Sequence, residues 1–304
     1  MKLIGLMPAR NEDWIIGFSA RVALMWCDAL VILDHASTDS TPMLICDIVN
    51  QHPGRVLYLN RNDPQWDEMG DRQRMLEAAR SMGSTHIAIV DADEVLTANL
   101  LPLVREQCAR LDRFDILQLP GYNLRDGLAY HTNGVWGRRW FSLAFQDNEG
   151  LCWHGDRFHH REPFGRHLEP WQPVAQSFGG ILHFWGASTR RLMAKHALYK
   201  ITERLRWPEK PIGQIESQYN LAIVPPAELA WTYGALHEEW FSEEYWTLFK
   251  QYVDLWSRPW QIEECRRLIR KHGIQCFEGL NLFGVDYPDE RNQPAEQQHA
   301  RSAR

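Results

Sequence analysis

Two aspartates separated by one residue follow an apolar run in the first third of the chain. Residues 87–94 read Ile-Ala-Ile-Val-Asp-Ala-Asp-Glu, so a buried strand leads directly into Asp91 and Asp93. Carboxylates at the end of a strand concentrate negative charge, and hard oxygen ligands suit Mg²⁺ or Mn²⁺, which complete their shell with water and substrate phosphates. The motif predicts a divalent cation and a phosphate-bearing substrate. The alternative is a structural loop, with Asp93 or Thr97 capping a helix over 98–111.

The apolar periodicity around this motif predicts strands that alternate with helices over the first 120 residues. The predicted strands cover 2–7, 29–33, 55–59, 85–90 and 114–119, and the predicted helices cover 12–26, 41–50, 67–82 and 99–111. This alternation is typical of an α/β fold with a mostly parallel sheet, helices on both faces, and ligands beyond the carboxyl ends of the strands. Polar loops follow the first four strands, so we expect them to converge at one edge of the sheet.

Composition limits the class of protein. A chain of 304 residues with 44% hydrophobic content can bury a large core, and no stretch is long and apolar enough to span a membrane. The first residues contain no secretory leader pattern, and the six cysteines form no C-x-x-C pair, so we expect reduced thiols and a cytoplasmic location. The net charge of -6 disfavours a general polyanion binder.

Neither a G-x-G-x-x-G nor a P-loop motif is present, which disfavours the dinucleotide-binding and P-loop versions of an α/β sheet. The motifs that are present are Arg10-Asn11-Glu12, Asp34-x-x-Ser37-Thr38-Asp39-x-Thr41 and Asp91-x-Asp93. In this order they closely resemble the nucleotide-sugar half of family-2-type glycosyltransferases with the GT-A fold. The resemblance is good over about residues 1–120 and looser to about 205.

The resemblance implies a set of site residues. Its nucleotide-sugar-binding positions are Pro8, Arg10, Glu12, Asp34, Ser37, Arg72 and Asp91, with Asp34 on the base and either Arg72 or Arg74 facing the base or phosphates. Asp93 would be the main metal ligand, and Asp91 would bind the ribose or a metal-bound water. Glu12 and Asp39 have an alternative role as first-turn carboxylates of their helices.

A histidine in the second half completes the implied metal site. His183 ends a short apolar strand in Gly179-Gly180-Ile181-Leu182-His183, and similar transferases place a histidine here that returns to the metal. The predicted ligands are therefore Asp91, Asp93 and His183. A strand-end histidine that is only hydrogen-bonded in a core is the alternative.

The segment 152–169 holds the candidates for a general base. An inverting transferase needs a carboxylate or imidazole that removes the proton of the acceptor hydroxyl. The candidates are Asp156, His159, His160 and Glu162. The His-Glu pair of similar transferases is not matched residue by residue here, so the base stays open among them, and Asp156 is the favoured candidate. A zinc site built from the histidines is an alternative, although no cysteines stand at finger spacing.

The sequence therefore predicts a GT-A-like domain over 1–206, made of a nucleotide-sugar half (1–120) and an acceptor half (121–206). A helical extension over 207–286 and a disordered polar tail over 287–304 would follow. The predicted function is metal-dependent transfer of a sugar from a nucleotide-diphosphate sugar, UDP favoured, with Mn²⁺ or Mg²⁺. The acceptor would be a saccharide or lipid-linked glycan, or a modified base in DNA. A metal-dependent nucleotidyltransferase and a carbohydrate-binding module that uses the fourteen tryptophans remain as alternatives.

Overall fold

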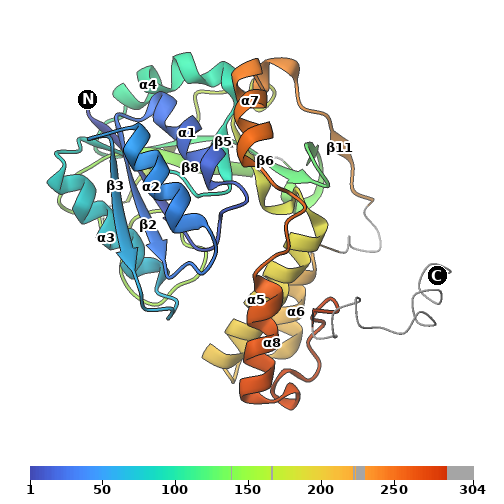
Figure 1. The fold of residues 1–304 in the computed structure, drawn as a ribbon. Helices are drawn as coiled ribbons and strands as arrows, with labels where there is room; N and C mark the ends of the chain where they lie inside the picture. The colour runs from blue at the N-terminus through green and yellow to red at the C-terminus, as the bar shows by residue number, and fades with distance from the viewer. Residues whose placement is uncertain (138, 166, 222, 224–229, 286–304) are drawn as a thin grey trace. The chain divides into compact units, whose positions relative to one another are not determined.

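The computed structural model describes residues 1–137, 139–165, 167–221, 223 and 230–285 (Figure 1). The chain divides into two compact units. The first contains residues 1–187 and 231–257, and the second contains the described parts of 188–230 and 258–304. This division differs from the predicted boundary at 206, because the helix over 189–206 packs with helices of the second unit and the segment 231–257 packs with the first. The predicted tail over 287–304 lies outside the described residues.

Four parallel strands in the order β3-β2-β1-β4 form the centre of the first unit. Their bounds are β1 Leu3–Ala9, β2 Ala29–His35, β3 Val56–Arg61 and β4 His86–Ile89. The helices that connect them are α1 Ile16–Trp26, α2 Thr41–Gln51 and α3 Glu68–Ser81. Each crossover returns the chain so that all four strands end at the same edge.

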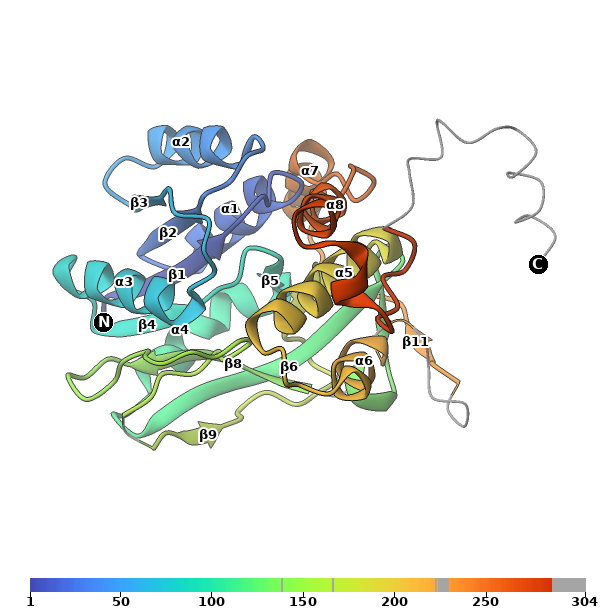
Figure 2. The same ribbon diagram turned by 90° about the horizontal axis from the view of Figure 1, so that it is seen from below.

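Alternating side chains of the strands explain why helices cover both faces of this sheet. On β1, Leu3 and Met7 belong to one hydrophobic cluster with residues of α1 and α2, while Ile4 and Leu6 belong to another with residues of α3. A strand that is apolar at successive positions buries both faces. The predicted α/β fold, with a parallel sheet between helices, is confirmed for this part of the chain (Figures 1 and 2).

The sheet continues beyond β4 with strands of mixed direction. Strand β8 pairs antiparallel with both β4 and β6. Strand β6 is longer than predicted because four other strands, β7, β8, β9 and β10, pair along it. The remaining elements of this region are β5 Glu94–Leu96, η1 Ala98–Leu100, α4 Leu101–Ala109, β6 Asp115–Arg125, β7 Ala129–His131, η2 Gly134–Trp136, β8 Arg139–Gln146, β9 Glu169–Trp171, β10 Ile181–His183, η3 Phe184–Gly186, β11 Tyr233–Gly234, η4 Glu238–Trp240 and α7 Glu243–Tyr252.

A glycine allows β10 to enter the sheet beside β6. A Cβ on Gly180 would lie 1.8 Å from the carbonyl oxygen of Pro120, so only glycine permits this approach. Strand β10 then pairs parallel with β6 and antiparallel with β5, which sets His183 opposite Asn123 on one side and Glu94 on the other. The close approach brings the far half of the chain to the end of β4.

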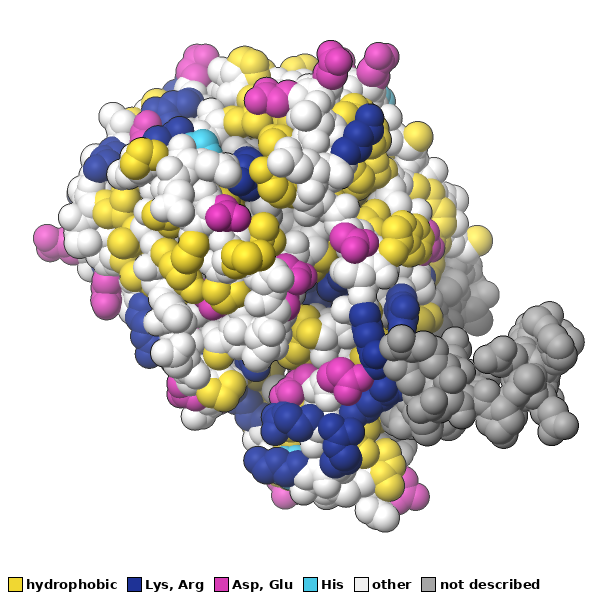
Figure 3. Space-filling view, viewed as in Figure 1, with side chains coloured by type: hydrophobic (Ala, Val, Ile, Leu, Met, Phe, Trp, Pro, Cys, Tyr) yellow, Lys and Arg dark blue, Asp and Glu magenta, His cyan; other side chains and the backbone are white. Residues whose placement is uncertain are grey.

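The second unit is helical. It contains α5 Thr189–Arg206, α6 Ile212–Asn220, α8 Gln261–His272 and η5 Ile274–Phe277, and α5 packs against both α6 and α8. Arg267, Arg270 and Lys271 of α8 are exposed. Lys and Arg side chains also form visible groups on the face of the molecule drawn in Figure 3. No helix of the described residues is long and apolar enough to cross a membrane.

Candidate active site

Loops at the carboxyl ends of β1 and β2 are joined by one asparagine. Asn11 has a left-handed backbone conformation (φ 55) and is buried, and its side-chain oxygen accepts hydrogen bonds from the backbone N–H groups of Thr38 (2.6 Å) and Asp39 (3.2 Å). Its own N–H donates to Ser37 Oγ at 2.8 Å. Asparagine tolerates this backbone region better than most residues. These bonds place the two loops side by side.

Asp34, the predicted base contact, is almost fully buried at the end of β2. Its Oδ1 accepts from the Ser37 N–H at 3.2 Å, and its Oδ2 accepts from the Tyr58 hydroxyl at 3.3 Å. Burial and the neighbouring Asp34 charge raise the pKa of Tyr58 to about 12, so the phenol stays protonated as a donor. These hydrogen bonds do not test the predicted contact between Asp34 and the nucleobase of a donor, which stays a prediction.

The other residues predicted on the nucleotide side have local contacts of their own. Pro8 is half-buried within β1, and Arg10 donates to the carbonyl of Pro64 at 3.0 Å. Glu12 accepts from the indole N–H of Trp14 at 2.6 Å, and its backbone N–H donates to Thr41. The alternative role of Glu12 as a first-turn carboxylate is not supported, because α1 begins at Ile16 and has no acidic residue in its first turn. A nucleotide contact for these three residues stays a prediction.

Asp91 lies between two arginines. Arg72 of α3 reaches its Oδ1 at 3.1 Å, and Arg161, from the loop after β8, reaches its Oδ2 at 3.0 Å. Burial raises the pKa of Asp91, but these guanidinium groups outweigh burial and hold the pKa below its usual value. Asp91 is therefore a carboxylate at neutral pH. The structure brings Arg72 to this carboxylate, while Arg74 pairs instead with Asp71 at 2.8 Å.

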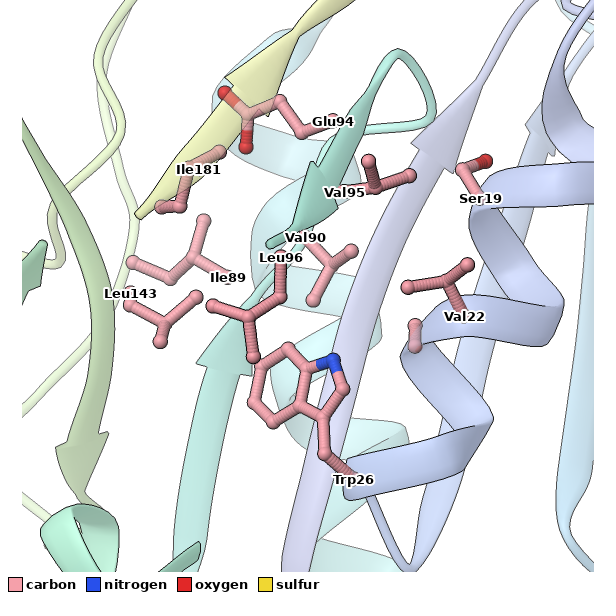
Figure 4. A pocket seen from close by; sticks show the side chains of 11 residues that line it. Ser19, Val22, Trp26, Ile89, Val90, Glu94, Val95, Leu96, Leu143 and Ile181 are labelled. Carbon is pink, nitrogen blue, oxygen red and sulfur yellow. The ribbon is translucent and has the colours of Figure 1, made fainter. Parts of the chain in front are cut away.

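Arg161 connects this loop to the interior. Its guanidinium also pairs with Glu94 at 2.7 Å and donates to the carbonyls of Ile89 (2.9 Å) and Ser142 (2.6 Å). Glu94 lies beside a pocket whose other lining residues are almost all apolar (Figure 4). Burial raises the pKa of Glu94, and Arg161 opposes that shift. Arg161 thus holds two carboxylates that would otherwise repel each other.

Asp93 and His183 form a second pair at the same edge. His183 Nε2 lies 3.6 Å from Asp93 Oδ1, and His183 Nδ1 lies 2.9 Å from Asn123 Oδ1. The Asn123 amide group donates to the carbonyl of Trp136 at 2.8 Å, which fixes the amide orientation so that its oxygen faces the histidine. Nδ1 must then carry a proton, and in the neutral imidazole the lone pair of Nε2 faces a carboxylate. That arrangement is favourable when a proton or a cation lies between the two groups.

The three predicted metal ligands do not converge. Among the described residues, no group of three His, Cys, Asp or Glu side chains is placed to hold a metal ion. Both carboxylate oxygens of Asp91 pair with arginines. The residues that could bind a cation at this edge are therefore Asp93 and His183. The alternative reading of Asp93 as a helix cap is not supported, because β5 follows it, and the Thr97 hydroxyl accepts from Gly180 N–H instead of capping η1. The histidines of 152–169 form no zinc group within the described residues.

The candidate bases lie along the loop that carries Arg161. Asp156 is exposed, and His160 stacks on Phe164 with ring centroids 4.2 Å apart. Burial and then Arg157 lower the pKa of His160, so its imidazole is neutral and able to accept a proton. Glu162 accepts hydrogen bonds from Ser142 and Gln118, which orient it toward the sheet. None of these contacts distinguishes one base from another.

Sequence reasoning assigned no role to three residues of this site. Arg161 and Asn123 lie 70 and 30 residues from the Asp-x-Asp motif in the chain, and no spacing signal connects them to it. Glu94 directly follows the Asp-x-Asp motif. Three carboxylates so close in the chain need a cationic partner, and this requirement was a sequence signal that could have predicted an arginine or a metal beside Glu94.

Known proteins are similar to this chain only among solved structures. The sequence matches no protein-family model and no curated protein. The full TarS structure of S. aureus is similar at 12% identity and a TM-score of 0.41, covering 74% of this chain and 44% of that one. The mannosyltransferase PcManGT of Pyrobaculum calidifontis, in complex with GDP-Man and Mn²⁺, is similar at 18% identity and a TM-score of 0.30, covering 41% and 35%. The 4-diphosphocytidyl-2C-methyl-D-erythritol synthase of Anaerococcus prevotii is similar at 12% identity and a TM-score of 0.34, covering 47% and 69%.

The chain spans less than half of the TarS and PcManGT structures that it matches. Identities and scores this low assign neither an activity nor a ligand to this chain.

Proposed function

We propose that this protein is a metal-dependent glycosyltransferase that uses a nucleotide-diphosphate sugar, with UDP as the favoured nucleotide. The observation that carries the proposal is the Asp93–His183 pair, in which the hydrogen bond of Nδ1 to Asn123 orients the ring so that Nε2 faces a carboxylate oxygen 3.6 Å away. The pair lies where the parallel strands end, the position at which α/β sheets bind their ligands. The motif resemblance to family-2-type glycosyltransferases supports the same reading.

The donor set suits Mn²⁺ or Mg²⁺. One carboxylate and one imidazole leave most coordination positions for water and for phosphate oxygens, as these ions require when they bind nucleotides. When bound, the cation would neutralise charge on the departing diphosphate. The hydrogen bond from His183 Nδ1 to Asn123 Oδ1 leaves Nε2 as the ring nitrogen that can bind the cation.

The other charged residues would serve the nucleotide. Asp91 stays ionised between Arg72 and Arg161, so it accepts hydrogen bonds from ribose hydroxyls or metal-bound water without being drawn to the cation. We favour Asp156 as the base that removes the acceptor proton, because it is exposed and so can approach an acceptor.

Binding of nucleotide and metal tests the donor side. UDP with Mn²⁺ should raise the melting temperature of the wild-type protein, and Asp93→Asn should abolish the metal-dependent part of that shift. His183→Ala should weaken it as well. Asp13→Asn, another aspartate in a loop after a strand of the parallel sheet, is a control that should keep it. Equal Mn²⁺-dependent shifts in Asp93→Asn and the wild type would remove Asp93 from the metal site.

The chemical products separate the two transferase classes. Glycosyl transfer or donor hydrolysis from a UDP-sugar releases UDP, whereas a nucleotidyltransferase acting on UTP and a sugar phosphate releases pyrophosphate. Release of UDP supports the proposal. Release of pyrophosphate alone would assign the nucleotidyltransferase class instead.

A further inference from the structure

A buried histidine without a hydrogen-bond partner lies beyond the site just described. His131, at the end of β7, is 2% exposed, and neither of its ring nitrogens has a hydrogen-bond partner among the described residues. A buried polar group in this state is destabilising, and protein interiors rarely leave one unpaired without a reason. The imidazole is therefore suited to gain a partner from a ligand.

Aromatic rings surround this imidazole. Tyr233 on β11 stands directly opposite His131 in the antiparallel pair, with ring centroids 5.0 Å apart, and Trp231 lies edge-on at 5.2 Å. Tyr233 is 46% exposed to solvent. Its ring therefore has room to rotate away from His131. Arg125 lies over the Trp231 ring at 5.4 Å. Flat aromatic faces beside hydrogen-bonding groups are the usual surroundings of sugar rings in proteins.

The protonation state of His131 suits a hydroxyl-rich ligand. Burial, and then the charge of Arg125, lower the pKa of His131 to about 4, with Asp126 acting in the opposite direction. The imidazole is thus neutral at neutral pH and presents one donor and one acceptor. A hydroxyl group can satisfy either nitrogen.

Strand β6 links this place to the Asp93–His183 pair. Asn123, which holds His183, and Arg125 are two residues apart on β6, so their side chains lie on the same face and about 6.6 Å apart along the strand. That spacing is on the scale of one sugar ring. The loop that follows His131 also returns to Asn123, since the carbonyl of Trp136 accepts the Asn123 amide.

We propose that Arg125, His131 and Tyr233 form a subsite for a saccharide acceptor, one sugar ring beyond the Asp93–His183 pair. The inference rests on the proposed glycosyltransferase function and names its acceptor class. A sugar ring packs on Tyr233, whose side chain moves to uncover His131, and a sugar hydroxyl bonds to the imidazole.

A printed array of neutral, amino and acidic oligosaccharides, probed with the protein in saturating UDP and Mn²⁺, tests this subsite. The oligosaccharide that binds most strongly is then titrated in solution. His131→Leu should weaken that binding about tenfold or more, as should Tyr233→Ala, because each removes a contact with a desolvated sugar. Trp256→Ala, which removes an exposed aromatic residue elsewhere in the first unit, should bind as the wild type does.

Stability separates a binding role from a structural one. His131→Leu loses no hydrogen bond within the described residues, so its melting temperature should equal or exceed that of the wild type. His131→Gln keeps a donor and an acceptor and should retain most of the saccharide binding; it also serves if the leucine variant does not fold. Wild-type saccharide binding in His131→Leu, or no saccharide bound by the wild-type protein, would overturn the subsite. The rise in melting temperature of the wild-type protein with UDP and Mn²⁺ is measured in a separate experiment. If that rise is absent while saccharide binding is found, the proposed function is rejected and the saccharide result stands.

Discussion

Replacement of Arg161 by methionine should be among the most damaging single changes in the first unit. The guanidinium makes five hydrogen bonds to described residues, two of them to Glu94, which is 4% exposed at the side chain. Methionine keeps much of the side-chain volume but leaves the buried Glu94 charge uncompensated. Removing one partner of a buried ion pair costs roughly 3–5 kcal/mol. Because the side chain of Arg161 is 18% exposed, we expect a value near the lower end, about 3 kcal/mol.

Urea unfolding measures this loss, followed by circular dichroism and tryptophan fluorescence to check that the transitions coincide. Arg110→Met is a matched control, because Arg110 pairs with Glu106 on the surface, where both side chains are 59% exposed, and it should change stability by less than about 0.5 kcal/mol. Arg161→Lys keeps the charge but cannot bond both carboxylates with a planar fork, so it should fall between the methionine variant and the wild type.

A double-mutant cycle and the pH dependence identify Glu94 as the cause. Adding Glu94→Gln to Arg161→Met should recover about 1–2 kcal/mol, since the uncompensated charge is gone. Burial already raises the pKa of Glu94, and loss of Arg161 raises it further. At pH values between the pKa of Glu94 in the unfolded state and its higher pKa in the folded state, the native protein binds more protons than the unfolded protein. The Arg161→Met protein should therefore regain stability as pH falls from 7 toward 5. A loss below about 1 kcal/mol, or strictly additive single effects, would refute this account of Arg161.

Three further predictions concern other parts of the chain. Asp156→Asn should leave UDP and Mn²⁺ binding unchanged yet lower sugar transfer by about 10² to 10⁴, measured as product formed per enzyme; if Glu162→Gln has this effect and Asp156→Asn does not, the base is Glu162. Since the folded pKa of His131 (about 4) lies below its usual 6.5, the unfolded state binds more protons between these values, and stability should fall as pH drops from 6.5 to 4. His131→Leu should reduce that fall in urea titrations, and an identical pH profile in the variant would contradict the shifted pKa. In the second unit Lys200 is fully buried and pairs with Glu216 at 2.9 Å, so Lys200→Ala should cost roughly 3 kcal/mol or more in urea unfolding; a cost under about 1 kcal/mol would show that the pair adds little.

The strand and helix pattern of the first 120 residues was predictable from the sequence because it depends on local periodicity. Apolar runs such as Ile87–Ile89 predicted buried strands, and α3 begins and ends within one residue of its predicted bounds. The convergence of the polar loops follows from the geometry of parallel strands. Asp34, Asp91 and Asp93 were singled out for this reason, since each lies in the last residues of a strand of that sheet or in the loop that follows one.

Only the tertiary structure decided how those residues are paired. Arg161 and Asn123 reach the site through β8, β6 and β10, and long-range pairing of this kind depends on the whole sheet, so no local pattern reports it. The domain boundary near 187 was likewise hidden, because the helix over 189–206 is rich in charged residues, some of them buried, and its sequence does not indicate which unit it packs against.

The sequence by itself determined which chemical groups stand at the ends of the strands: carboxylates, a histidine and basic residues suited to a cation and a nucleotide. The tertiary structure decided which of them share an interaction. In the folded chain Asp91 pairs with two arginines, and Asp93 faces His183. Separations of a few ångströms and the degree of burial determine how strongly such charged groups interact. Those separations are fixed by packing between residues far apart in the chain, and a sequence pattern does not contain them.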